Sequence, residues 1–153
     1  MRIPMPYGRG ERTISVPDSA VLARGQRMPP LTNPIDALRE ALDRPIQSAR
    51  LEELAQGKER ACIVISDNTR AVPNQLLLPE IVERIRHETD KIDVLIANGL
   101  HPPLTAEGIT DLVGVKLPSS CNVMNHRPRD TDNLQRLGTT MTSGMPIWIN
   151  STY

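Results

Sequence analysis

Two short apolar runs in the middle of the sequence are each followed at once by a polar loop. Residues 61–65 lead into Ser-Asp-Asn-Thr-Arg, and residues 92–97 lead into Asn-Gly-Leu-His. Short, continuous apolar runs are typical of parallel strands that are covered on both faces. The loops that follow such strands meet at one edge of the sheet, where ligands bind. The two runs therefore predict an α/β fold with a candidate site in these loops.

Two helices are predicted before the first run. Asn33 and Pro34 indicate a helix start, because the Asn side chain accepts an unpaired N–H and Pro fits the first turn. Pro45 marks the end of this helix. A second helix is predicted from Ser48, with Gly57 just beyond its end.

Helical periodicity also follows each of the two apolar runs. An apolar stripe over residues 77–85 predicts a helix, in which Pro79 either belongs to the first turn or follows a short turn and marks a kink. Thr105 and Gly114 are typical of the two ends of a shorter helix. This order predicts a Rossmann-like parallel or mixed sheet flanked by helices. Weaker strand candidates are residues 121–124 and 147–149.

Residues 1–32 are rich in Pro, Gly and Arg, and we interpret them as an N-terminal arm. The arm is predicted to contribute one short strand, residues 12–16, before Pro17. The alternative is a partly ordered leader. The predicted organisation is therefore an arm over residues 1–32 and an α/β domain over residues 33–153.

Composition excludes several functions. The formal net charge of zero and the 2% aromatic content argue against nucleic-acid and anionic-lipid partners. No apolar run reaches the roughly 18 residues of a membrane span, and no signal sequence is evident, so we expect a soluble, cytoplasmic protein. Cys62 and Cys121 are interpreted as buried, reduced thiols, with a disulfide or a metal pair as the alternative. No spacing predicts a metal site.

The first polar loop contains a carboxylate and a guanidinium three residues apart, Asp67 and Arg70. Arg binds carboxylate or phosphate through two parallel hydrogen bonds, and Asn68 and Thr69 add further polar groups. The loop therefore indicates an anion-binding site. The competing interpretation is an Asp67–Arg70 ion pair that only stabilises the loop.

The second polar loop ends in His101, which suits proton transfer near neutral pH. A loop histidine is also a common surface residue, but adjacent parallel strands would bring His101 to the same edge as Asp67 and Arg70. His126 follows another possible strand and is a weaker ligand-contact candidate, whereas His87 at a helix end needs no functional role.

Three stretches resemble the lactate racemases that use a nickel pincer nucleotide. They are residues 42–48 together with 51–58, the loop Ser-Asp-Asn-Thr-Arg-Ala-Val-Pro at 66–73, and Asn-Gly-Leu-His-Pro-Pro-Leu-Thr at 98–105. Leu-Gly-Thr-Thr at 137–140 and Ile-Trp-Ile-Asn at 147–150 are also similar. The resemblance covers nearly the whole chain in the right order.

The resemblance implies specific roles. Asp67, Asn68, Thr69 and Arg70 would contact the nickel pincer nucleotide, and Arg70 would also lie close to the substrate carboxylate. His101 would be one of two catalytic histidines that exchange the hydroxyl proton of a 2-hydroxy acid, while hydride moves between its α-carbon and the cofactor. The implied activity is that of a 2-hydroxy-acid racemase or epimerase.

The sequence also departs from the family. Pro102 and Ala71 stand where the family usually has Arg and Pro, which leaves the particular 2-hydroxy acid open. The second histidine, the lysine that tethers the cofactor and the nickel-ligating histidine have no counterpart here. We therefore expect an N-terminal segment of a larger two-domain enzyme, inactive by itself and completed by a C-terminal part. The alternatives are a non-catalytic module that binds an anion or nucleotide, and an inert fragment.

Overall fold

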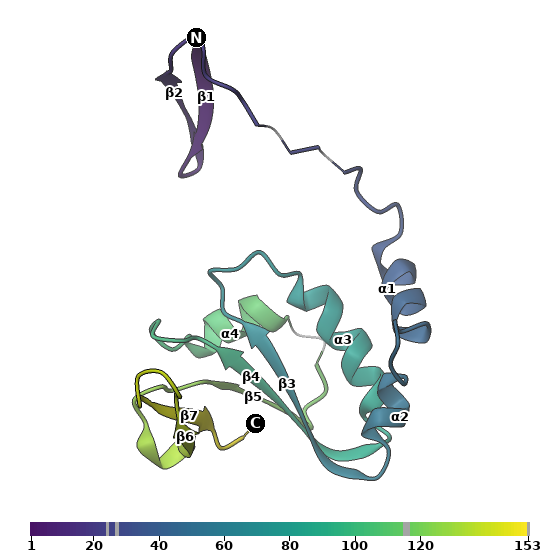
Figure 1. Ribbon diagram of the computed structural model, residues 1–153. Helices are drawn as coiled ribbons and strands as arrows, with labels where there is room; N and C mark the ends of the chain where they lie inside the picture. The colour runs from purple at the N-terminus through teal and green to yellow at the C-terminus, as the bar shows by residue number, and fades with distance from the viewer. Residues whose placement is uncertain (24, 27, 115–116, 153) are drawn as a thin grey trace. The chain divides into compact units, whose positions relative to one another are not determined.

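The computed structural model describes residues 1–23, 25–26, 28–114 and 117–152 (Figure 1). The chain separates into two compact units, Met1–Thr32 and Asn33–Tyr153, and each is described by itself. Within the described residues, no helix is long and apolar enough to cross a membrane.

The first unit contains an antiparallel hairpin of β1 (Arg2–Tyr7) and β2 (Gly10–Ser15). Gly8 turns the chain with a φ of 59°, as a two-residue hairpin loop requires. The arm thus contains two strands where one was predicted, and the strand that was missed, β1, carries Pro4 and Pro6. Both prolines are tolerated, since each strand of an isolated hairpin is an edge strand.

The second unit is built on a parallel sheet in the order β3–β4–β5, which confirms the predicted α/β fold. The strands are β3 (Lys58–Ser66), β4 (Thr89–Ala97) and β5 (Cys121–Asn125). In-register pairing aligns Ser66 with Ala97 and Ile96 with Asn125. The carboxyl ends of all three strands therefore lie at one edge of the sheet.

The described residues of this unit also form the α-helices α1 (Pro34–Asp43), α2 (Leu51–Ala55), α3 (Asn74–Ile85) and α4 (Ala106–Val113). Thr105 and Gly114 end α4 as predicted, and the Thr105 hydroxyl accepts a hydrogen bond from the Gly108 N–H at 3.1 Å. Two details were wrong. Asn33 donates its side-chain amide to Asp36 and does not accept an N–H from the helix, and α2 begins at Leu51, three residues after Ser48.

Helix α3 begins earlier than either arrangement predicted around Pro79. Its first turn forms because the carbonyl of Pro73 accepts the N–H groups of Leu76 and Leu77 at 2.9 and 3.1 Å. The helix then continues through Pro79 to Ile85. The polar loop after β3 is consequently short and ends directly at a helix start.

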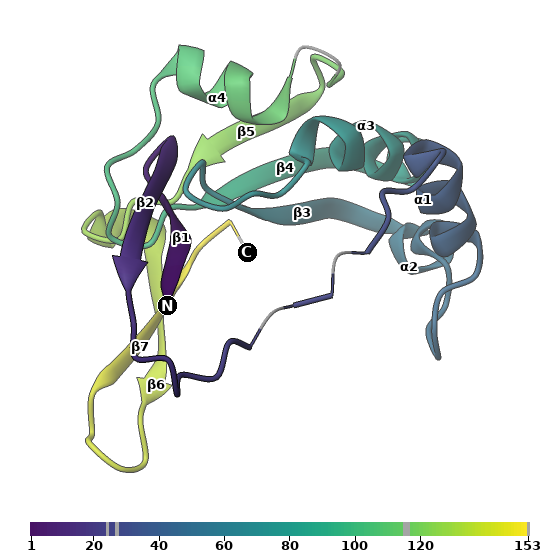
Figure 2. The same cartoon turned by 90° about the horizontal axis from the view of Figure 1, so that it is seen from above.

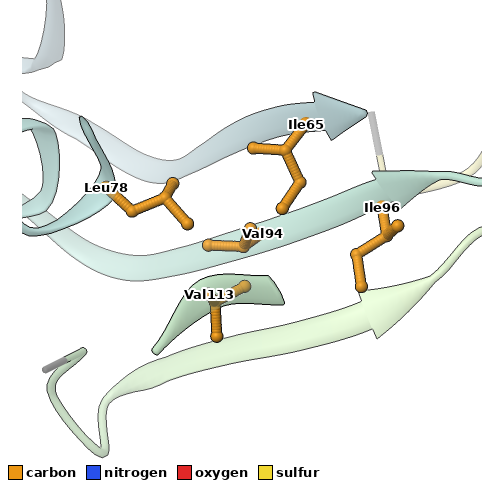
Figure 3. Packing of buried hydrophobic residues seen from close by; sticks show 5 residues of the cluster. All are labelled: Ile65, Leu78, Val94, Ile96 and Val113. Atoms are coloured by element: carbon orange, nitrogen blue, oxygen red, sulfur yellow. The ribbon is translucent and has the colours of Figure 1, made fainter. Parts of the chain in front are cut away.

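The main core lies on the face of the sheet covered by α3 and α4 (Figure 3). Leu78 of α3 and Val113 of α4 point toward Val94, and Ile65 and Ile96 extend the same apolar face. Val94 and Ile96 are fully buried, and Leu78 is 1% exposed. The core thus reaches the carboxyl ends of both strands, since Ile65 and Ile96 lie one residue before the ends of β3 and β4.

The opposite face of the sheet is less covered than the apolar runs predicted. Val64 of β3 is 46% exposed, so the expectation of cover on both faces was wrong for this strand. Alternation places Val64 away from α3 and α4, which lie on the other face. Cys62 and Cys121 are both free and half-buried, and the register directs them to opposite faces. A disulfide between them is therefore excluded.

The C-terminal part forms a second antiparallel hairpin of β6 (Leu134–Thr139) and β7 (Pro146–Asn150) after the short 3₁₀ helix η1 (Thr131–Asn133). This hairpin lies near the carboxyl ends of the parallel strands in both views (Figures 1 and 2). Strands at residues 121–124 and 147–149 were predicted, whereas β6 was not. The side chain of Asn150 joins the hairpin to His126, with 3.2 Å between Nδ2 and Nδ1.

Candidate active site

Asp67 and His101 meet at the carboxyl edge of the sheet. Asp67 directly follows β3, and His101 follows β4 after a turn in which its N–H donates to the Asn98 carbonyl at 3.0 Å. The aligned ends of β3 and β4 place both loops side by side. His101 Nδ1 lies 2.5 Å from Asp67 Oδ2.

The Asp67 carboxylate is buried, at 4% exposure, and each of its oxygens is hydrogen-bonded. Oδ1 accepts from the Thr69 hydroxyl at 2.6 Å and from the Thr69 N–H at 3.2 Å. These bonds to Thr69 and the contact with His101 lower the pKa of Asp67 to about 2, although its burial acts in the opposite direction. The carboxylate is therefore ionised at neutral pH.

An ionised Asp67 fixes the tautomer of a neutral His101. A carboxylate only accepts hydrogen bonds, so Nδ1 must carry the proton that is donated to Oδ2. Nε2 is then an acceptor, on a side chain that is 53% exposed. The ring is thus held by one nitrogen and presents the other outward, as a general base requires.

Arg70 does not pair with Asp67, although both residues lie in the described part of the chain. The backbone N–H of Arg70 donates to the Asp67 carbonyl at 3.2 Å, but the guanidinium bonds only the Thr69 hydroxyl among the described residues, through Nη1 at 3.5 Å. The interpretation of the loop as an Asp67–Arg70 ion pair was therefore wrong. The carboxylate is turned toward His101 because the neighbouring strand supplies a partner, which leaves the guanidinium exposed for a ligand.

A hollow of about 340 Å³ joins the two loops, and we call it the Arg70 hollow. It is lined by Ser66, Asp67, Arg70, Ala97, Asn98, Gly99, Leu100 and His101. Asn68 and Arg70 also line a hollow of about 500 Å³ beside the start of α3. Asn74 lines it too, is 2% exposed, and has an Nδ2 without a hydrogen-bond partner among the described residues.

Sequence reasoning missed the asparagines that support the site. Asn125 ends β5, and its side chain accepts the Leu104 N–H and donates to the Leu104 carbonyl, both at 2.9 Å. This pair of bonds ties the His101 loop to β5. Asn98 is 2% exposed, and its backbone carbonyl accepts the N–H of His101, which closes the turn. The available signal was an Asn at the end of an apolar strand, where its amide can replace missing backbone partners.

His126 reaches the same edge of the sheet, since its N–H donates to the Ile96 carbonyl at 2.9 Å. Its Nδ1 faces the Asn150 amide, and its ring and His101 line one further hollow. His87 does not line any of the hollows described here. Among the described residues, no group of three or more His, Cys, Asp or Glu side chains is placed to hold a metal ion.

A parallel sheet with a hollow at its carboxyl edge is the arrangement typical of α/β domains that bind small molecules. The comparison with protein families makes the assignment specific. The model of the lactate racemase N-terminal domain matches residues 7–153. The chain belongs to that family.

Two curated relatives are lactate racemases. The protein of Thermoanaerobacterium thermosaccharolyticum is 30% identical over 97% of this chain and 36% of its own length. That of Lactiplantibacillus plantarum is 32% identical over 71% of this chain and 26% of its own length. The chain thus spans about a third or less of the length of these relatives.

Solved structures agree with the family assignment. The lactate racemase apoprotein from Thermoanaerobacterium thermosaccharolyticum matches 99% of this chain and 36% of its own, with a TM-score of 0.81 and 29% identity. A protein from Thermotoga maritima matches 76% of this chain with a TM-score of 0.59 and 16% identity, which shows likeness of fold alone. The family resemblance seen in the sequence is confirmed.

Proposed function

We propose that this chain forms one wall of the active site of a cytoplasmic 2-hydroxy-acid racemase or epimerase that works with a nickel pincer nucleotide. The single observation that carries the proposal is the Asp67–His101 hydrogen bond beside an arginine that has no acidic partner among the described residues. Relatives named lactate racemase support the substrate class. Arg70 would bind the carboxylate, and His101 would face the hydroxyl.

The proton chemistry follows from the geometry of the pair. The hydroxyl of a bound 2-hydroxy acid would donate to Nε2 of His101, which takes the proton as the α-carbon is oxidised and returns it on reduction. Asp67 stabilises the imidazolium that forms, because its carboxylate stays ionised at a pKa of about 2. Arg70 fixes the acid end through two parallel hydrogen bonds, so that the hydroxyl lies toward His101.

The residues of the first loop fit a nucleotide cofactor. Asn68 and Arg70 are exposed, and together with Asn74 they line a hollow of suitable size at the start of α3. Asp67 and Thr69 are already hydrogen-bonded, so we assign them to the shape of the loop, with free lone pairs of Asp67 left as acceptors. The bound pincer nucleotide would supply the centre that accepts and returns hydride. No nickel ligand is assigned to the described residues of this chain.

A binding experiment with the whole chain tests the proposal. A racemase must bind both enantiomers, so we expect calorimetry to detect D- and L-lactate with affinities within about tenfold of each other. Arg70→Ala should weaken both by at least about tenfold, since a charge-assisted pair is lost. Arg136→Ala, an exposed arginine on β6, is the matched control and should change neither.

Two results would contradict the proposal: binding of neither enantiomer, or binding that Arg70→Ala leaves unchanged. Asn74 Nδ2, which has no hydrogen-bond partner among the described residues and lines a hollow with Arg70, also fits one alternative, a non-catalytic anion- or nucleotide-binding module. Such a module would bind a nucleotide equally well after His101→Ala. In our proposal the purified chain shows no turnover, and His101→Ala weakens the binding of lactate.

A further inference from the structure

A second hollow, of about 470 Å³, also borders His101, and we call it the Arg127–Arg129 hollow. It is lined by the His101 loop and by the loop that follows β5: Leu100, His101, Pro102, Pro103, His126, Arg127, Pro128, Arg129 and Asp130. His101 is shared with the Arg70 hollow. The proposed base therefore borders two hollows with cationic lining residues, Arg70 in one and Arg127 and Arg129 in the other.

The charge of this hollow is net positive. Neither Arg127 nor Arg129 forms an ion pair with any acid in the described part of the chain. Asp130 is the one acid among the lining residues, and its Oδ2 accepts the Asn133 amide at 2.7 Å. Its N–H also donates to the Arg127 carbonyl at 3.1 Å, which closes a turn. The lining thus contains two exposed arginines and one carboxylate that is already hydrogen-bonded.

Hydrogen bonds to the backbone hold the walls of the hollow in place. The Asn125 side chain ties Leu104, next to Pro103, to the end of β5. The His126 N–H bonds the Ile96 carbonyl at the end of β4. Pro102, Pro103 and Pro128 further restrict the two loops. A site with restricted walls loses little conformational freedom when a ligand binds, so that contacts made there add to affinity.

We infer that Arg127 and Arg129 form an anion subsite beside His101, and that the 2-hydroxy acid bound here carries a second anionic group. This inference rests on the proposed function. A monocarboxylic acid held by Arg70 would leave both arginines to water. An acid with a carboxylate at each end would engage Arg70 with one and the Arg127–Arg129 hollow with the other, while its hydroxyl faces His101.

Two ligands could place an anion in this hollow beside His101: the second carboxylate of a 2-hydroxy acid, or the phosphate of a nucleotide. The experiment therefore compares three probes by calorimetry on the whole chain at fixed ionic strength: lactate, 2-hydroxysuccinate and adenosine monophosphate. We expect 2-hydroxysuccinate to bind about tenfold more tightly than lactate, because one more charge-assisted contact forms. The affinity for adenosine monophosphate should not change when Arg127 or Arg129 is replaced.

The variants separate this inference from the proposed function. Arg127→Ala and Arg129→Ala should remove the advantage of 2-hydroxysuccinate and leave lactate unchanged, whereas Arg70→Ala weakens both acids. Arg136→Ala is again the matched control for loss of a surface charge. An amide NMR spectrum of each variant verifies that the fold is kept.

Three outcomes would overturn the inference. If both acids bind equally but depend on Arg70, the subsite is wrong and the proposed function stands. If neither acid binds, the proposed function fails and the subsite fails with it. If the two arginines affect only adenosine monophosphate, the hollow holds a phosphate and the second group of the acid is not needed.

Discussion

His101 Nδ1 lies 2.5 Å from Asp67 Oδ2, although 34 residues separate the two in the sequence. The contact exists because β3 and β4 are adjacent, parallel and aligned, so that the loops after them meet. The Asp67 carboxylate therefore orients the imidazole of His101, and it forms no ion pair with the Arg70 guanidinium.

Thr69→Val should raise the pKa of Asp67 from about 2 toward the ordinary value, because the Thr69 hydroxyl makes the largest contribution to lowering it. The depressed pKa means that ionised Asp67 stabilises the folded state above about pH 4, and that this contribution is lost as the pH falls toward 2. Carbon-13 NMR of the Asp67 carboxyl measures the midpoint. Thr139→Val on β6 is the control, and an unchanged midpoint in Thr69→Val would contradict the assigned bond.

Asp93→Asn should make Cys62 more reactive. Burial is the main reason that the pKa of the Cys62 thiol is raised, and the nearby Asp93 carboxylate raises it further. Removing that charge should lower the pKa and speed alkylation by iodoacetamide severalfold near pH 8. Mass spectrometry can follow Cys121 in the same sample, where burial alone raises the pKa. Equal acceleration at both thiols would indicate unfolding and refute the charge effect.

Arg84→Met should destabilise the second unit by about 1–2 kcal/mol. The Arg84 side chain is 15% exposed and bonds Asp43 of α1 at 2.7 Å and Glu52 of α2 at 2.8 Å. Loss of Arg84 removes the ion pair of the partly buried Glu52. The other carboxylate oxygen, Oε2, already lacks a hydrogen bond within the described chain, so Glu52 would be left poorly compensated. Urea unfolding measures the change.

The control for Arg84 is Arg86→Met, which removes an exposed pair with Glu83 on the same helix. It should cost less than about 0.5 kcal/mol, because solvent screens such pairs. Equal losses in the two variants would show that the Arg84 network adds nothing beyond an ordinary surface pair.

Leu78→Ala should destabilise the fold by about 3 kcal/mol, because it opens a cavity where α3 packs on β3 and β4. Leu78 is 1% exposed, whereas Val64, on the other face of the sheet, is 46% exposed. Val64→Ala should therefore cost well under about 1 kcal/mol in the same urea experiment. The reverse order would mean that the opposite face holds the main core.

Local signals predicted much of the scaffold. Helix α4 begins after Thr105 and ends before Gly114, as expected. The hydroxyl cap of Thr105 and the positive φ of Gly114, 79°, depend on the type of a single residue, so the sequence alone indicates them. The parallel arrangement of β3 and β4 also followed from two short apolar runs separated by a helical stripe. The strands β1 and β6 were missed, since Pro4, Pro6 and Gly138 weaken the strand pattern and only the paired strand compensates for them.

The sequence by itself determined which groups this protein can use: a carboxylate and an arginine after one strand, and a histidine after the next. The sequence of those loops also indicated the family, which the family model confirms. Only the tertiary structure decided the partners. Asp67 pairs with His101 and not with Arg70, because strand register brings together atoms that sequence distance separates. The same register makes His101 the shared wall of two hollows, which no local pattern encodes.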